Sequence, residues 1–282
     1  MTAVAPIAVR RTRAVRLRPR SGLALVVVSA VGLVAFCWPL LVEPGSGLDG
    51  GATAPWLFVA LLPLLLAVVL AEVADGGLDV KSVAVLGVLA AVGAALRPLG
   101  GGAAGFEPVF FLLVLAGRAL GPGFGLVLGS VTLFASALLT AGVGPWLPFQ
   151  MLAAGWVGFL AGCLPTARGR AEVVLLTAYG AVAGLLYGLL MNLQLWPFAT
   201  GLESGLSYVA GDPLGDNLGR FLAFTLATSM GFDIPRAVTT AVLVAVTARP
   251  VLLALRRAAR KAEFGAVGEF AAAAPRPDVT AG

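Results

Sequence analysis

The sequence predicts an all-α polytopic membrane protein, a helical bundle with about eight transmembrane helices. Of its 282 residues, 59% are hydrophobic and only 12% are charged, whereas a soluble domain carries about 25% charged residues. The mean hydropathy is +0.98, and apolar runs of spanning length recur along the chain. Because so few charges cannot cover a water-facing surface, we expect most of the surface to face lipid.

Eight apolar runs are the predicted spans. They are residues 22–42, 55–71, 82–96, 108–120, 123–140, 146–164, 173–192 and 234–255. Segment 218–230 is apolar but too short to cross a bilayer, so we expect a re-entrant or interfacial piece there. Asp233 and Pro235 follow it: Asp233 is predicted to cap the start of the last helix, and Pro235 to lie in the first turn of that helix.

Basic residues give the expected orientation of these spans. Six arginines lie within residues 10–20 and four basic residues within 256–261. Clusters that flank apolar spans favour the cytoplasmic side and contact anionic lipid, so nucleic acid is not an expected partner. We therefore expect a plasma-membrane protein with both termini cytoplasmic: a basic N-terminus over 1–21 and a loose tail over 261–282. The run 23–42 is long enough to span, so we expect it to be retained rather than cleaved as a signal peptide.

The residue types exclude most catalytic chemistry. The chain has no histidine, which removes the commonest metal ligand and general base. Its only lysines are Lys81 and Lys261, neither of which lies in a GxxxxGK[ST] motif, so we expect no P-loop and no ATP hydrolysis by this chain. No paired carboxylates or activated nucleophile stand out, so we expect no enzyme, no cofactor and no metal. Cys37 and Cys163 fall within predicted spans, where we expect two unbridged, buried thiols.

Four predicted spans carry glycine or alanine at every fourth residue, which places small side chains on one helix face. These sets are Gly87, Ala91, Ala95; Gly121, Gly125, Gly129; Ala154, Gly158, Gly162; and Gly180, Gly184, Gly188. Such faces favour close helix packing, either within the chain or against a partner subunit. Gly121 and Pro122 predict a tight turn between helices rather than a dinucleotide loop, because Leu126 occupies the place of the last glycine.

Polar groups are few, and they lie near the ends of spans. Amide and aromatic residues gather near the predicted outer ends: Trp146, Phe149, Gln150, Tyr187, Asn192, Gln194 and Trp196. Such a set is compatible with an interfacial aromatic belt or with an apolar pocket that carries a few amides. Arg97 and Glu107 border one outer loop, where they are expected either to pair or to contact a ligand. Arg118 is expected to extend toward the inner head groups.

Several of these motifs, taken in order, resemble one transporter family. Residues 106–108, the run 116–129 with its Gly-Pro turn, residues 144–148, the small face of Ala154, Gly158 and Gly162, and residues 232–236 carry the resemblance. Residues 81–257 are similar to the substrate-binding (S) subunits of energy-coupling-factor vitamin transporters. The resemblance implies a six-helix substrate-binding core over 81–260, preceded by two additional helices within 22–80.

The resemblance implies a capture subunit for a vitamin-like micronutrient, with cobalamin favoured by family analogy alone. A transmembrane coupling subunit and two ATPase subunits would be its partners. Family members dock the coupling subunit through small residues, which here correspond to Gly87, Ala91, Ala95, Gly121, Gly125 and Gly129. The candidate substrate site comprises Arg97, Glu107, Trp146, Gln150, Tyr187, Asn192, Gln194, Trp196, Asn217 and Arg220.

Two other classes of function are alternatives. A secondary carrier acting alone would show interrupted helices and charged groups at the midplane in two related halves, and the sequence shows neither. The other alternative is a membrane-embedded enzyme or an assembly scaffold. An enzyme would need a catalytic cluster at one membrane face, and the lack of histidine and of clustered acids counts against it.

Overall fold

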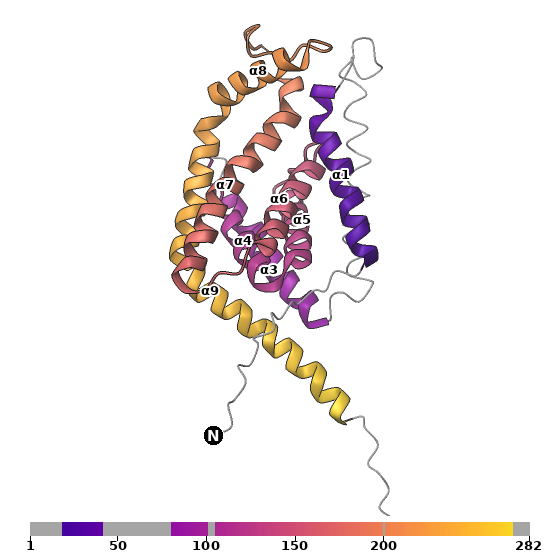
Figure 1. The fold of residues 1–282 in the computed structure, drawn as a ribbon, viewed down its shortest axis with the longest axis vertical. Helices are drawn as coiled ribbons and strands as arrows, with labels where there is room; N and C mark the ends of the chain where they lie inside the picture. Colours follow the sequence, from indigo (N-terminus) through magenta and orange to yellow (C-terminus); the bar gives the residue numbers. More distant parts are fainter. Residues whose placement is uncertain (1–18, 42–79, 101–104, 200, 273–282) are drawn as a thin grey trace, which may run out of the picture.

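The computed structural model describes residues 19–41, 80–100, 105–199 and 201–272, which are helical with short connections and contain no strand (Figure 1). The helices are α1 (Pro19–Leu41), α3 (Val80–Leu99), α4 (Val109–Leu120), α5 (Pro122–Leu139), α6 (Leu147–Cys163), α7 (Gly169–Leu195), α8 (Leu214–Phe224) and α9 (Met230–Ala272). A 3₁₀ turn η1 (Trp196–Phe198) follows α7, and a π turn η2 (Thr225–Ser229) joins α8 to α9. The predicted all-α class is confirmed.

Four described elements are long and apolar enough to cross a membrane: Val80–Leu99, Pro122–Leu139, Gly169–Phe198 and Leu214–Arg260. Shorter apolar helices cover Leu25–Leu41, Val109–Leu120 and Leu147–Cys163. These lengths fit a helical membrane protein. The count of eight spans stays a prediction, because the expected span 55–71 lies outside the described residues.

Helices α3 to α7 alternate in direction between two ends of the bundle. Arg97 at the end of α3 bonds Gln150 at the start of α6, and Arg118 at the end of α4 bonds Glu172 at the start of α7. We call the end that contains Arg97 and Gln150 the α8 end, and the end that contains Arg118 and Glu172 the Glu172 end. The start of α1 and the far part of α9 both lie toward the Glu172 end (Figure 1).

Small residues bring α5 and α6 into backbone contact. A Cβ atom built on Gly125 would lie 2.3 Å from the carbonyl oxygen of Gly158, and one built on Gly129 would lie 2.3 Å from that of Ala154. Two backbones this close gain dispersion contacts that larger side chains would prevent. The predicted small faces of α5 and α6 therefore pack against each other inside the chain.

The other two small faces differ from each other. On α7, a Cβ atom on Gly184 would lie 3.0 Å from the Cα atom of Ala237, so this face packs on α9. On α3, Gly87, Ala91 and Ala95 are exposed, and a Cβ atom on Gly87 would meet no described atom within 4 Å. Among the described helices, the α3 face is thus the small-residue face that no neighbour covers.

The turn between α4 and α5 has the predicted form. Gly121 caps α4 with a φ of 106°, a left-handed value that favours glycine, and Pro122 begins α5. The tight Gly-Pro turn is confirmed.

The last helix differs from prediction. Segment 218–230, expected as a separate re-entrant or interfacial piece, runs through η2 into α9 without a break. Asp233 therefore lies inside a continuous helical path and is not an N-cap; its carboxylate accepts a bond from Arg236 instead. A π turn needs no glycine, proline or capping residue, so the sequence carried no local sign of this continuity.

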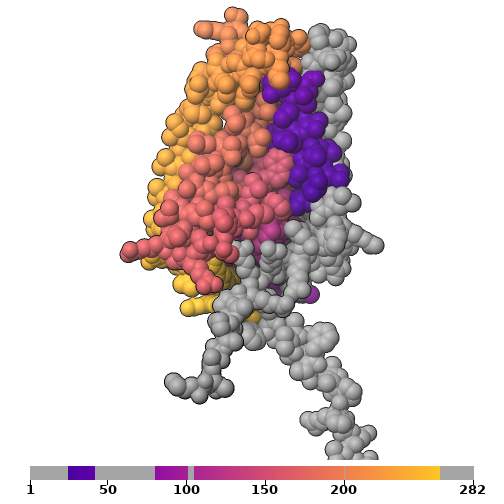
Figure 2. Space-filling view, in the orientation of Figure 1, coloured from indigo at the N-terminus to yellow at the C-terminus, as the bar shows by residue number. Residues whose placement is uncertain are grey.

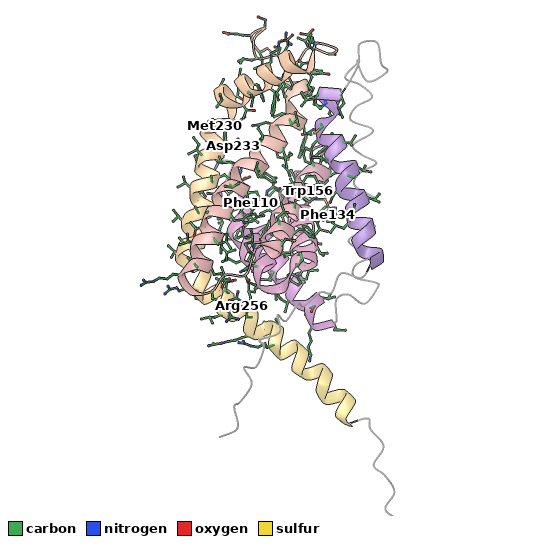
Figure 3. The ribbon with its side chains drawn as sticks, viewed as in Figure 1. Phe110, Phe134, Trp156, Met230, Asp233 and Arg256 are labelled. Atoms are coloured by element: carbon green, nitrogen blue, oxygen red, sulfur yellow. The ribbon has the colours of Figure 1, made fainter. Side chains whose placement is uncertain are left out.

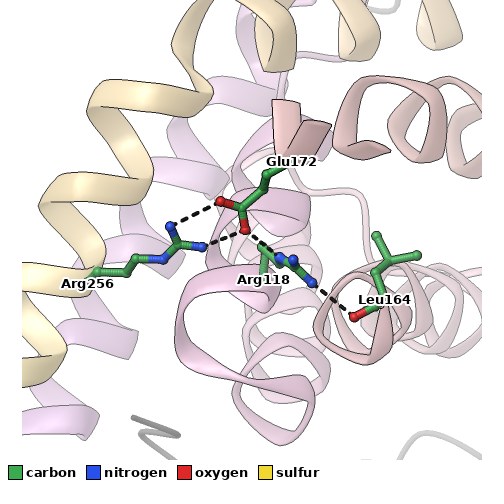
Figure 4. Close-up of polar contacts among 4 residues, drawn as sticks. All are labelled: Arg118, Leu164, Glu172 and Arg256. Atoms are coloured by element: carbon green, nitrogen blue, oxygen red, sulfur yellow. Dashed lines mark hydrogen bonds and ion pairs between the residues drawn. The ribbon is translucent and has the colours of Figure 1, made fainter. Parts of the chain in front are cut away.

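At the Glu172 end, three charged residues form a cluster in which Arg118 and Glu172 are buried and Arg256 is partly exposed (Figure 4). Arg118 Nε lies 2.7 Å from Glu172 Oε1, and Arg118 Nη1 donates to the Leu164 carbonyl at 3.0 Å. Arg256 contacts both oxygens of the same carboxylate, at 2.6 and 3.1 Å. The side chain of Arg118 is only 5% exposed, so the expectation that it extends to head groups is wrong. The cluster links α4, α7, α9 and the end of α6.

The cysteines are not joined by a disulfide, as expected. Their predicted burial is wrong, since Cys37 is half-buried and Cys163 is exposed. Cys163 is the last residue of α6, beyond the contact between α5 and α6.

We predict that Gly125→Val destabilises the fold whereas Gly87→Val does not. The new side chain at position 125 meets backbone that cannot rotate away, and overpacking of this kind costs about 3 kcal/mol. The side chain at position 87 enters open space. The midpoint of thermal unfolding in detergent measures both, and equal midpoints for the two variants would contradict the packing described.

We also predict that Glu172→Gln lowers the free energy of unfolding by about 3 kcal/mol or more, because it leaves Arg118 buried without a carboxylate. The matched control is Asp212→Asn, which breaks the partly exposed pair of Asp212 and Arg220 and should cost less than about 1 kcal/mol. Unfolding by titration with a denaturing detergent measures both. A smaller effect at Glu172 than at Asp212 would refute the role of the cluster.

Candidate functional site

A cavity of about 560 Å³ lies at the α8 end, between the start of α6 and the end of α7. Its volume falls within the range of roughly 300–1,000 Å³ that is typical of small-ligand sites. Most of its lining is apolar, with three carboxamide side chains among the lining residues. The eight lining residues are Pro145, Trp146, Gln150, Met191, Asn192, Gln194, Leu195 and Phe198.

Local structure explains how these side chains converge. Met191, Leu195 and Phe198 are spaced by four and three residues, which places them on one face of the last turns of α7 and of η1. On the opposite side, Trp146 immediately precedes α6, and its indole Nε1 donates to the Gly142 carbonyl at 3.1 Å. The cavity thus has one wall from the start of α6 and one from the end of α7.

The carboxamides give the cavity its polar chemistry. Gln150 Oε1 accepts a hydrogen bond from Arg97 Nη2 at 3.0 Å, which fixes the orientation of this amide. Asn192 Nδ2 is buried and makes no hydrogen bond of normal geometry with the described residues, but its side chain lies beside the carboxylate of Asp233, which offers a protein acceptor. Because Asn192 also lines the cavity, its amide is a candidate for contact with a ligand.

Behind the α7 wall, an ionic network joins α4, α7 and α9. The Arg236 guanidinium contacts the carboxylate of Glu107 through Nε and that of Asp233 through Nη1, the latter at 2.5 Å. It also lies over the ring of Tyr187, 5.4 Å from the ring centre. Tyr187 in turn packs edge-on against Phe110 at 4.7 Å. Figure 3 shows Asp233 near Met230 in the α8 half of α9, with Arg256 toward the other end.

This network corrects one expected pairing. Glu107 pairs with Arg236 and not with Arg97, which bonds Gln150 instead. Arg236 is 129 residues from Glu107 in sequence, so the partner could be identified only from the way α4 packs on α9.

Three further candidates support the connection between α7 and α8 and do not line the cavity. Trp196 is fully buried, and its Nε1 donates to the Leu206 carbonyl at 2.7 Å. Asn217 bonds both the N–H and the carbonyl of Val209, and Arg220 pairs with Asp212 at 2.7 Å. These side chains hold residues 201–213 against α8.

Of the ten candidate site residues, the cavity is lined by Trp146, Gln150, Asn192 and Gln194. Arg97, Glu107 and Tyr187 lie behind its walls, and Trp196, Asn217 and Arg220 support the adjoining connection. Sequence reasoning missed the apolar lining residues Pro145, Met191, Leu195 and Phe198. The helical spacing of Met191 and Leu195, next to the two amides of α7, could have indicated part of this set.

Comparison with known proteins bears on what this cavity serves. A family model described as "ECF transporter, substrate-specific component" matches residues 81–254. The chain belongs to this family. No curated protein and no solved structure is significantly similar to the chain. The matched residues contain both walls of the cavity, whereas α1 precedes them.

Membership of the ECF family gives the chain a general role. Substrate-specific components are membrane subunits that bind a substrate and work with a coupling component and ATPases. The family is one of substrate-binding transporter subunits and not of enzymes.

Proposed function

We propose that this S component captures a flat, uncharged micronutrient of the vitamin type in the cavity between α6 and α7, for import driven by ATP hydrolysis on partner subunits. The observation that carries the proposal is the cavity itself: an apolar lining with aromatic rings and three carboxamides, inside the part of the chain that matches the family.

The chemistry of the lining supports an uncharged ligand. No charged side chain is among the eight lining residues. A carboxylate or ammonium group taken into such a lining would lose its hydration without gaining a counter-charge, which is costly. Carboxamides both donate and accept hydrogen bonds, so they suit the N–H and C=O groups of a neutral heterocycle. The rings of Trp146 and Phe198 offer flat apolar surface for it.

The volume of the cavity bears on cobalamin, the favourite by family analogy. A cavity of about 560 Å³ suits a ligand of drug-like size. A corrinoid is larger and would be enclosed only in part, so we favour a smaller flat vitamin, such as one of riboflavin size.

Charge distribution supports a cavity that opens to the outside. The Glu172 end carries Arg118, Arg168, Arg170, Arg256, Arg257 and Arg260. By the positive-inside rule this end faces the cytoplasm. The membrane in this proposal is the plasma membrane. Because the start of α1 and the far part of α9 lie toward the same end (Figure 1), both termini are cytoplasmic in this proposal.

The uncovered small-residue face of α3 supports docking of a coupling subunit there. Gly87, Ala91 and Ala95 are exposed, so a partner helix could approach the backbone closely. The corresponding residues are Gly121, which precedes α5, and Gly125 and Gly129 within α5; all three are buried, and Gly125 and Gly129 contact α6. Our proposal therefore assigns docking to α3, with a coupling subunit and two ATPase subunits as the partners.

The ligand proposal is tested with the purified full chain and four vitamins: riboflavin, cobalamin, biotin and thiamine. Biotin has a carboxylate, and thiamine is positively charged. We expect riboflavin to bind best. Trp146→Ala and Asn192→Leu should each weaken binding about tenfold, the effect of one lost contact of about 1.4 kcal/mol. Phe106→Ala is the control, since Phe106 is an exposed aromatic residue that does not line the cavity. Titration calorimetry measures affinity, and binding of none of the four would count against the proposal.

The docking proposal predicts that Gly87→Val prevents co-purification of the coupling subunit and stops vitamin uptake, while vitamin binding by the isolated chain is unchanged. The reason is steric, since the valine would hold a partner helix away from α3. Gly219→Val is the matched control, because Gly219 is an exposed helical glycine on α8 that also has open space around it. Normal assembly of the Gly87→Val variant would show that α3 is not the docking face.

A further inference from the structure

Helix α1, which lies outside the residues that match the family, contacts the part of the chain that forms the cavity. Its main neighbours are α6, α7 and α8. Figure 2 shows α1 lying along this face of the molecule and reaching the residues around α8. The contacts that it makes differ on the two sides of the cavity.

On the α6 side, α1 packs against the residues beside the lining. Phe36 is fully buried and meets the ring of Phe149 edge-on at 4.8 Å. Phe149 directly precedes the lining residue Gln150. Further along, the indole Nε1 of Trp156 donates to Ser29 Oγ at 3.0 Å. These contacts fix α1 against the α6 wall.

On the α7 side, α1 packs against a lining residue itself. The ring of Trp38 lies 6.0 Å from that of Phe198 and 6.2 Å from that of Tyr208. Cys37 and Leu40 pack against the cluster of buried apolar residues that includes Trp196 and Leu193. Phe198 therefore has the cavity on one side and α1 on another.

We propose that α1 positions the two walls of the cavity relative to each other, with Trp38 as the positioning residue for Phe198. The inference rests on the proposed function of the cavity. Helix α1 holds α6 through Phe36 and η1 through Trp38, and so it sets the width of the space in which a flat ligand is enclosed. Trp38 touches no ligand; it acts through Phe198.

Removal of the Trp38 ring should let η1 and the connection after it move away from α6. Trp38→Ala deletes the ring, Trp38→Leu keeps apolar volume without the ring, and Trp38→Phe restores a ring. Val34→Ala is the control, because Val34 is a mostly exposed residue of the same helix. The thermal unfolding midpoint of each variant identifies those that fold.

The first test needs no ligand. Spin labels are placed on Cys at positions 143 and 209 (Val143→Cys and Val209→Cys) in a chain with Cys37→Ala and Cys163→Ala. One label lies before α6 and the other lies in the connection between η1 and α8, and both valines are exposed. We expect a narrow distance distribution in the chain with Trp38, a broader or longer one with Trp38→Ala and Trp38→Leu, and recovery with Trp38→Phe. Unchanged distributions in the folded Trp38→Ala or Trp38→Leu variant would overturn the inference.

The second test uses riboflavin as the probe. Trp38→Ala and Trp38→Leu should speed its dissociation about tenfold, with Trp38→Phe and Val34→Ala close to the unmodified chain. Unaltered dissociation from the folded variants would overturn the inference even if the spin labels move. If the unmodified chain binds none of the four vitamins, the ligand proposal fails, and the spin-label distances alone decide the role of α1; if it binds one other than riboflavin, that vitamin is the probe.

Discussion

The burial of charged side chains in a bundle that faces lipid is the constraint on which much of this structure depends. An unpaired charge in such a place is costly, so each buried ion needs a partner. Glu172 has two arginines, and Arg236 has two carboxylates. These groups satisfy one another, which leaves the lining of the cavity to carboxamides and apolar side chains. The neutral character of the site follows from where the charges are paired.

A second constraint is the close approach of helix backbones. The contact of Gly125 with Gly158 leaves no space between α5 and α6, so these two helices behave as one rigid unit. A cavity cannot form at that contact. It forms where the helices end and larger side chains keep them apart, between Trp146 and the last turn of α7. The same contact removes the small face of α5 from use by a partner, whereas that of α3 remains uncovered.

Much of the helical pattern and part of the site could be predicted from the sequence, because both depend on local signals. Apolar runs indicated the helices, the Gly121-Pro122 pair indicated a tight turn, and three amides and a tryptophan near the ends of spans indicated four lining residues. The partners of Glu107 and Arg118 could not be predicted, since they lie 129 and 54 residues away and meet only through helix packing. The continuous path through η2 was missed for a different reason, because π turns have no distinctive residue.

The two ends of the bundle are held together by different sets of contacts, and this difference bears on why the proposed ligand cavity lies at the α8 end. At the Glu172 end, Arg118 and Arg256 connect α4, α7 and α9 through one carboxylate, and Arg118 also bonds the end of α6. Hydrogen bonds of this kind are directional, and the side chains that make them occupy the space between the helices. At the α8 end, the ion pairs of Arg236 lie behind the α7 wall, and the cavity itself is bordered by aromatic contacts such as that of Trp38 with Phe198. Aromatic packing is less directional than ion pairing and tolerates small displacements. A ligand can therefore be admitted at the α8 end without breaking a buried ion pair, whereas entry at the Glu172 end would separate Arg118 from its carboxylate.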